Sequence, residues 1–243
     1  MRKKHCDLII EELEEIINDI KTKEVKLVES DEKDIMMPKV KSFLEHCRSI
    51  LEYCAQDTFE KVLSPEEREK KSKSRNNKVY FPYGHRRDIF ERNIHNNFPG
   101  LRSDNSVYKL IEKMQDYNRP YDKKFLSYMC DITNQNKHDK LSTHDRSSST
   151  TINIGDFISA TNTNIIIKDS YFDGIPSGDF KIKSDGTLEG DINPLLRSQL
   201  TVVKEGYLVF KDSNKKVIDF LELCLKEIRF FYTQFYKLIN KYI

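Results

Sequence analysis

The sequence predicts a mainly α-helical protein with a small inserted antiparallel β-sheet, an α+β fold. Three observations lead to this prediction. Apolar residues recur at helical spacing up to about residue 141, alternating and β-branched residues dominate 142–213, and helical spacing returns over 214–243. We therefore expect a helical region, a β-rich insertion and a C-terminal helix that packs back on the helical region and closes its core.

The composition fits a globular protein and excludes several other classes. The chain has 243 residues, of which 37% are apolar, and its 41 basic and 39 acidic residues nearly cancel, so a nucleic-acid partner would need a local basic patch. Five scattered cysteines without a C-x-x-C pair argue against a disulfide framework or a zinc ribbon. No run approaches the roughly 20 apolar residues of a membrane span. We expect a cytoplasmic protein with no membrane anchor, metal or cofactor.

Two helices are predicted in the first quarter of the chain. Apolar residues from Leu8 to Ile20 form one stripe among Glu, Asp and Lys. A longer stripe follows over 36–63, where Pro38 can open the helix and Ser64-Pro65 ends it. We expect this second helix to be the spine of the fold.

The middle of the chain predicts a loop and three shorter helices. Residues 65–78 include none of the large apolar types and predict a solvated, basic, mobile loop. Pro82 and Gly84 then make a short segment extended rather than helical. Helices are expected over 87–97, 106–117 and 122–140, the last with Asp122 as its N-cap.

The β-rich region begins at a polar hinge, Ser147-Ser148-Ser149-Thr150. Strands are predicted over 151–154, 164–168 and 180–182, and hairpin turns at Asp185-Gly186 and Glu205-Gly206. The apolar stripe over 216–243 is broad enough to need a partner, so we expect it to pack against the N-terminal helices.

The first candidate site lies near the end of the third short helix. Asn134 and His138 are four residues apart, on one face of a helix, and Lys137 is adjacent. A histidine that titrates near neutrality is a common general acid or base, and an amide or cation beside it can hold a phosphate oxygen. The same residues also fit a structural helix end, where Lys137 and His138 would bind free carbonyls, or a non-catalytic binding surface.

A second candidate site combines basic and aromatic residues, which together can neutralise phosphates and stack on bases. Its members are Arg86, Arg87, Arg92 and His95, beside Tyr80, Phe81 and Tyr83. The alternative is a solvated helix start that lies over core aromatics. Asp57, close to the apolar stripe of the long helix, fits a satisfied polar neighbour better than a catalytic acid.

Several of these segments together resemble HEPN domains. They are the Phe81-Pro82 segment, the Met114–Tyr117 helix end, the Arg119-Pro120-Tyr121 turn and Asn134-x-x-Lys137-His138, and the similarity covers residues 36–141. HEPN domains are helical modules found in bacterial toxin–antitoxin, abortive-infection and CRISPR-associated proteins. Active members cut RNA without a metal, using an Arg and a His on one helix, paired across a dimer. The resemblance implies that His138 is the acid or base.

The sequence departs from the HEPN pattern at Asn134, which stands four residues before His138 in the place of Arg. An amide cannot supply the fixed positive charge of a guanidinium. We therefore expect a non-catalytic scaffold or regulatory module in a bacterial stress or phage-defence setting. The alternative is a metal-independent endoribonuclease, with His138 as acid or base and phosphate held by Lys137 and the Arg86-Arg87 pair. A homodimer formed through the helices, a protein partner and RNA are the partners that these hypotheses include.

Overall fold

The computed structural model describes residues 2–26, 33–138, 144–210, 213 and 215–242, with side chains except at 25–26, 33–37, 135–138, 144–146 and 205. The protein is a mixed α and β structure, as predicted. It divides into two compact units. The helical unit comprises Met1–Lys21, Lys33–His144 and Phe210–Ile243, and the β-rich unit comprises Thr22–Glu32 and Asp145–Val209.

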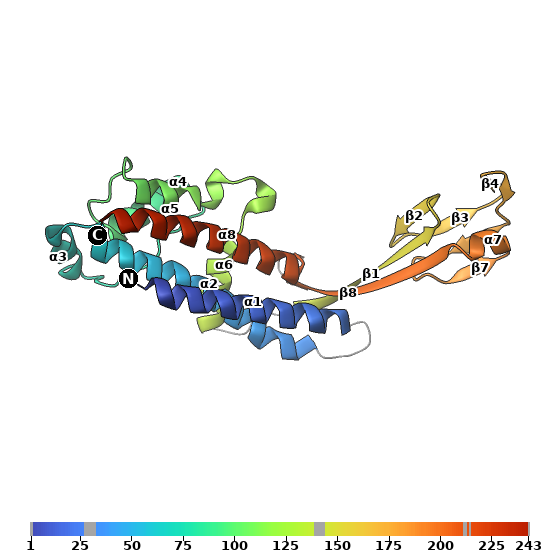
Figure 1. Ribbon diagram of the computed structural model, residues 1–243, viewed down its shortest axis with the longest axis horizontal. Coiled ribbons are helices and arrows are strands. Elements are labelled where there is room, and N and C mark those ends of the chain that lie inside the picture. The colour runs from blue at the N-terminus through green and yellow to red at the C-terminus, as the bar shows by residue number, and fades with distance from the viewer. Residues whose placement is uncertain (1, 27–32, 139–143, 211–212, 214, 243) are drawn as a thin grey trace. The chain divides into compact units, whose positions relative to one another are not determined.

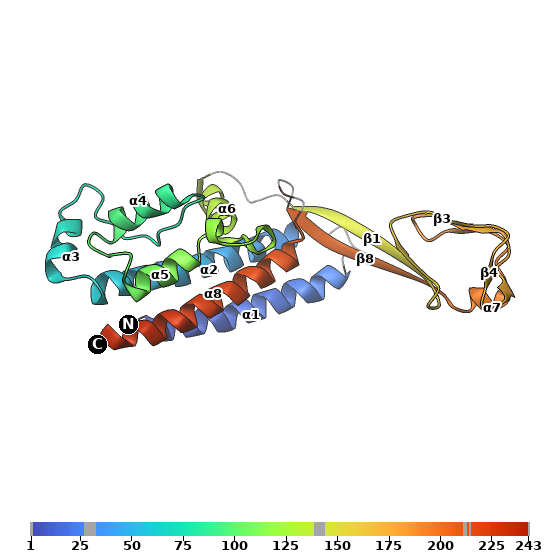
Figure 2. The ribbon, with the colours of Figure 1, turned by 90° about the horizontal axis from the view of Figure 1, so that it is seen from above.

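Three long helices form the frame of the helical unit: α1 (Lys3–Lys26), α2 (Lys33–Lys61) and α8 (Val217–Ile239), which a 3-10 turn, η3 (Asn240–Tyr242), follows. Figures 1 and 2 show α8 lying beside α1, and α8 also packs against α2. Two ion pairs, Lys21–Glu222 and Arg229–Glu14, connect α1 with α8. The helical spacing of the sequence therefore produces helices that share one core.

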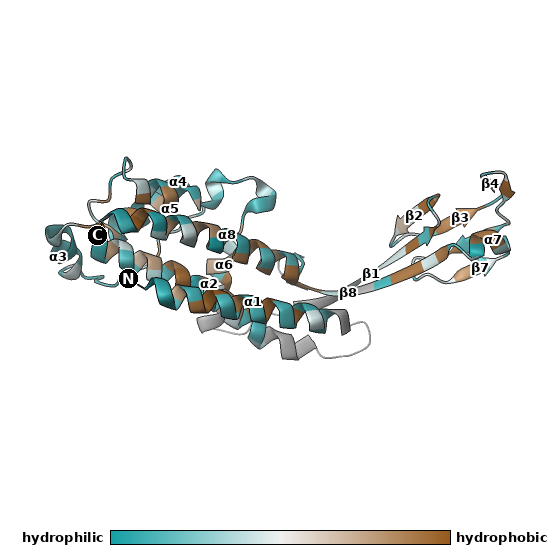
Figure 3. Ribbon diagram, in the orientation of Figure 1, coloured by the Kyte–Doolittle hydropathy of each residue, from teal (hydrophilic) through white to brown (hydrophobic). Residues whose placement is uncertain are grey.

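The core of this unit follows the predicted stripe of α2. Phe43, Cys47 and Ile50 are fully buried, and Cys54 is 1% exposed. Figure 3 shows hydrophobic and hydrophilic residues alternating along α1 and α8, as amphipathic helices require. The prediction that the apolar stripe of this long helix lies in the core is therefore confirmed.

The prediction of a mobile loop over 65–78 is wrong for its first half, because α3 (Pro65–Ser72) forms there. Pro65 occupies the first helical turn, and a capping box joins Ser64 and Glu67: the Glu67 N–H donates to Ser64 Oγ (3.2 Å) and the Ser64 N–H to Glu67 Oε2 (2.8 Å). These local bonds satisfy the free N–H groups at the helix start, and they need no apolar anchor.

The remaining helices of this unit are short: α4 (Arg87–Asn97), α5 (Ser106–Lys113) and α6 (Leu126–His138), with 3-10 turns η1 (Asp116–Asn118) and η2 (Tyr121–Lys123) before α6. Asp122 lies in η2 and is not the N-cap of α6. Asp116 takes that role, because its carboxylate accepts the N–H groups of Phe125 (2.9 Å), Leu126 (3.2 Å) and Ser127 (2.7 Å). This long-range cap fixes where α6 begins.

The β-rich unit contains three small antiparallel sheets. In the first, β1 (His144–Ile154) pairs with β2 (Ile158–Thr161) on one side and β8 (Leu200–Phe210) on the other. In the second, β6 (Phe180–Ile182) lies between β3 (Ile165–Ile167) and β7 (Leu188–Gly190). The third pairs β4 (Tyr171–Phe172) with β5 (Ile175–Pro176), and a short helix, α7 (Pro194–Arg197), precedes β8. Their inward residues form a separate apolar core that includes Ile152, Phe180 and Leu196.

Turn predictions in this unit had mixed outcomes. The Asp185-Gly186 hairpin between β6 and β7 is confirmed, and Gly186 has the positive φ (89°) that favours glycine. The Glu205-Gly206 hairpin is wrong, because β8 continues through it. The hinge at 147–150 is also wrong, since those residues belong to β1. β1 and β8 are neighbouring strands of 11 residues each. Pairing along this length outweighs the local preference for a turn at 205–206 and for a polar loop at 147–150.

Candidate functional site

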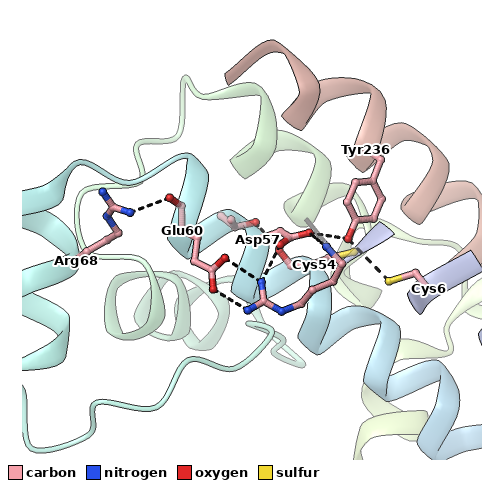
Figure 4. A network of polar contacts seen from close by, with 8 residues as sticks. Cys6, Cys54, Asp57, Glu60, Arg68 and Tyr236 are labelled. Atoms are coloured by element: carbon pink, nitrogen blue, oxygen red, sulfur yellow. Dashed lines mark hydrogen bonds and ion pairs between the residues drawn. The ribbon is translucent and has the colours of Figure 1, made fainter. Parts of the chain in front are cut away.

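A buried polar network surrounds Asp57, on α2 (Figure 4). Asp57 is fully buried, and its carboxylate accepts hydrogen bonds from Tyr236 Oη on α8 (2.7 Å), from Arg2 Nη1 (2.8 Å) and from the Arg2 backbone N–H (2.9 Å). Because no part of Asp57 is accessible, it cannot contact a substrate. Its interpretation as a satisfied polar neighbour of the apolar stripe therefore holds, although no local pattern predicts its partners Arg2 and Tyr236.

The outer part of this network joins α2 to its surroundings. Glu60 binds the Arg2 guanidinium (Oε1 to Nη2, 2.6 Å), and its backbone carbonyl accepts a hydrogen bond from Arg68 Nη1 on α3 (2.9 Å). The hydrogen bond with Arg2 lowers the pKa of Glu60. Burial, the largest cause, raises the pKa of Tyr236, whose hydroxyl also lies 3.8 Å from Cys6 Sγ. These contacts are structural, since they hold the N-terminus against α2 and α8.

A further candidate site is a pocket of about 620 Å³ on the helical unit, which we call the amide–tyrosine pocket. Its walls come from α2, from the extended segment before α4, from α4 itself and from α6. The residues that line it are Arg48, Glu52, Asn76, Val79, Tyr80, Phe81, Pro82, Tyr83, Asn93, Asn96, Asn97 and Asn134. Side-chain amides are the most frequent group in this lining.

Arg48 and Glu52 on α2 hold one side of the pocket. Arg48 Nε donates to Glu52 Oε1 (2.7 Å), and Glu52 Oε2 accepts the Phe81 N–H (2.8 Å), which fixes the extended segment to α2. The Arg48 guanidinium lies 5.2 Å from the centroid of the Tyr83 ring. Its Nη1 is buried and has no hydrogen-bond partner among the described residues. Because this atom is buried, Arg48 shapes the wall of the pocket and does not present this donor to a ligand.

Two asparagines of α4 order the extended segment on the other side. Asn93 Nδ2 donates to the Tyr83 carbonyl (2.6 Å), and Asn97 Oδ1 accepts the Tyr80 N–H (2.9 Å). Asn96, between them in the sequence, is exposed. Asn93, Asn96 and Asn97 recur at three- and four-residue steps, so they share one helix face. This face therefore shapes the segment that carries both pocket tyrosines.

Asn134 is the member of the predicted site that reaches this pocket. It is exposed on α6, and its Nδ2 donates to Tyr83 Oη (3.0 Å). Burial raises the pKa of Tyr83, so its hydroxyl stays protonated near neutral pH. Lys137 and His138 occupy the last turn of α6, but their side chains lie outside the described residues.

The predicted basic cluster does not gather at one place. Arg86 pairs with Asp88 (2.8 Å), and Arg87 pairs with Glu91 (2.9 Å) and Glu112 (3.5 Å), so carboxylates balance both charges. Their role in holding phosphate stays a prediction. Arg92 is exposed on α4 and does not line the amide–tyrosine pocket. His95 lies in a neighbouring pocket with three other basic residues.

Sequence analysis missed most of the pocket, although two signals were present. Arg48 and Glu52 are an oppositely charged pair four residues apart within the apolar stripe of the long predicted helix over 36–63. Asn93, Asn96 and Asn97 repeat one polar residue type at helical spacing. Neither signal says that the two helices meet at the same extended segment.

The described residues contain no cluster of three or more His, Cys, Asp or Glu that could hold a metal ion. Within the same residues, no helix combines the length and the apolar character needed to cross a membrane. Comparison of the chain with protein-family models, with curated proteins and with solved structures finds no match. The chemistry of the pocket is therefore the basis for proposing a function.

Proposed function

We propose that this protein is a non-catalytic binding module that holds a planar, hydrogen-bonding group in the amide–tyrosine pocket. The observation that carries this proposal is the gathering of side-chain amides from α4, α6 and the extended segment around one pocket that is also lined by two tyrosines. The HEPN-like relationship of the helical unit and a bacterial stress or phage-defence setting belong to the same proposal, and they rest on the sequence resemblance.

The lining chemistry favours an uncharged ring with both donors and acceptors. Each asparagine side chain offers two N–H donors and a carbonyl acceptor, and tyrosine rings offer faces for stacking. Tyr80 keeps 44% of its surface exposed and is free to stack against a ligand. The volume of about 620 Å³ lies within the 300–1,000 Å³ of typical small-ligand sites. A nucleobase has this size and hydrogen-bonding pattern.

The same lining argues against catalysis in this pocket. Among its described residues there is no His, Cys, Ser or Lys to act as a nucleophile or proton carrier. Its carboxylate, Glu52, is occupied by Arg48 and by the Phe81 N–H. Groups arranged in this way can recognise a ligand, but they do not supply an acid–base pair.

Binding of free nucleosides tests the proposal. Isothermal titration of the full-length protein with uridine, cytidine, adenosine and guanosine should show saturable binding of at least one of them. Tyr80→Ala should weaken that binding about 5- to 150-fold, because stacking of one base contributes about 1–3 kcal/mol. Asn77→Ala is the matched control, since Asn77 is an exposed amide outside the pocket. Absence of binding by all four nucleosides would overturn the proposal.

The ribonuclease hypothesis is the second candidate, because Asn134 lines the pocket and His138 follows it on the same helix. The binding proposal predicts that wild-type protein leaves single-stranded RNA intact in EDTA. Cleavage that is lost in His138→Ala would establish the alternative instead. A homodimer through the helices, a protein partner and RNA remain proposals, and light scattering of the purified protein tests the first of them.

A further inference from the structure

A second pocket, of about 380 Å³, adjoins the amide–tyrosine pocket and has the opposite chemical character. We call it the basic pocket. It is lined by Lys70, Lys71, Ser74, Arg75, Asn76, His95, Asn96 and Pro99. Four of these side chains are basic and none is acidic. In a chain whose total charge nearly cancels, such a local excess of cations favours an anionic ligand.

Lys71 is the most constrained cation of the basic pocket. It is only 3% exposed, and its Nζ donates to the Asn76 carbonyl (2.6 Å). Burial lowers the pKa of Lys71, and no carboxylate bonds its ammonium group in the described part of the chain. Ser74 Oγ also lies within hydrogen-bond distance of the Asn76 carbonyl (2.8 Å) and the Lys71 carbonyl (2.7 Å), which share its single hydroxyl hydrogen and hold this turn in place. A nearby anion would supply the charge partner that Lys71 lacks.

The exposed cations of the basic pocket are also without carboxylate partners. Lys70 and Arg75 are exposed and form no ion pair among the described residues, whereas Lys73, outside the pocket, pairs with Glu69 (2.6 Å). His95 adds a further nitrogen donor from α4. These positions differ from Arg86 and Arg87, whose charges nearby carboxylates already balance.

The two pockets share a wall, because Asn76 and Asn96 line both of them. A ligand that fills both therefore needs an uncharged, hydrogen-bonding ring at one end and an anion at the other. We propose that the ligand is a nucleotide unit, with its base in the amide–tyrosine pocket and its phosphate in the basic pocket. This inference rests on the proposed function and adds the phosphate site. A free nucleotide and a single-stranded nucleic acid share the same chemistry.

The experiment compares each nucleoside with its 5′-monophosphate by isothermal titration on the full-length protein. The phosphate should tighten binding about 10- to 150-fold, as expected for one charge-assisted hydrogen bond of about 1.5–3 kcal/mol. Arg75→Gln and Lys70→Gln should remove most of this gain while leaving nucleoside binding unchanged. Lys73→Gln is the matched control, because it removes a lysine of the same segment that lies outside the pocket.

The outcomes separate this inference from the proposed function. If nucleoside and monophosphate bind with equal affinity, the phosphate site is overturned and the nucleobase pocket stands. The same conclusion follows if the monophosphate still binds more tightly than the nucleoside in both glutamine variants. Failure of every nucleoside and nucleotide to bind would overturn both. Tighter binding of a short oligonucleotide than of the monophosphate would identify the ligand as a single-stranded nucleic acid. The logarithm of its affinity should then fall by about 0.7 per phosphate contact for each tenfold rise in salt concentration. Equal affinities would identify a free nucleotide.

Discussion

Tyr236→Phe tests the energetic role of the buried network around Asp57. The substitution removes a hydroxyl that donates to a fully buried carboxylate at 2.7 Å. The ring itself would stay in place, because it packs edge-on against the rings of Tyr232 and Phe235. The distances between ring centroids are 5.2 Å and 5.1 Å. The change therefore removes one charge-assisted hydrogen bond without opening a cavity.

The expected loss of unfolding free energy is about 1.5–3 kcal/mol, the usual value of a hydrogen bond to a charged group. For a chain of this length each kcal/mol shifts the melting temperature by about 2–4 °C, so the melting temperature should fall by about 3–12 °C. Far-ultraviolet circular dichroism of the full-length protein measures this shift. Its helical signal comes mainly from the unit that contains the Asp57 network, because the long helices belong to that unit.

Tyr232→Phe is the matched control. Tyr232 lies one turn earlier on α8, and its hydroxyl donates to Asp7, whose side chain is 42% exposed. Water can replace that bond, so the control should lose no more than about 1 kcal/mol. Equal losses in the two variants would refute the role of burial. Combining Tyr236→Phe with Asp57→Asn should give a loss smaller than the sum of the single losses, since each substitution removes the charge-assisted form of the same hydrogen bond.

Three further predictions concern the core, the capping box and an ion pair. Leu51→Ala should cost about 2–5 kcal/mol in urea unfolding, because Leu51 is fully buried, whereas Leu8→Ala, at 55% exposure, should change little. Ser64→Ala should cost about 1 kcal/mol locally and speed tryptic cleavage within α3 about fivefold. The hydrogen bond from Arg2 lowers the pKa of Glu60 in the folded protein. Ionised Glu60 therefore stabilises the fold at pH values above its unfolded-state pKa of about 4.3. This stabilisation is lost as the pH falls through the lower pKa of the folded state. Glu60→Gln should therefore reduce stability at pH 7, and its difference from wild type should shrink towards pH 3.

The candidate site was predictable only in part. Asn134 was identified from its helical spacing to His138, and it does line the pocket. Arg48 and the asparagines of α4 were not identified, because each looks like an ordinary polar residue on its own helix. The contact that unites them, between α2 and the extended segment at Phe81, joins residues 29 positions apart in the sequence. Local patterns carry no information about such a contact.

The sequence by itself determined the mixed α and β class, the buried face of α2 and the Asp185-Gly186 turn, because periodicity and turn chemistry act over a few residues. Tertiary structure alone decided that Asp116 caps α6, that Arg2 and Tyr236 satisfy Asp57, and that β8 runs straight through Gly206. In each of these cases a partner distant in sequence supplies the hydrogen bonds. Buried donors and acceptors must form hydrogen bonds, but many groups along the chain could supply them. Only the folded structure determines which of these groups lies close enough to do so.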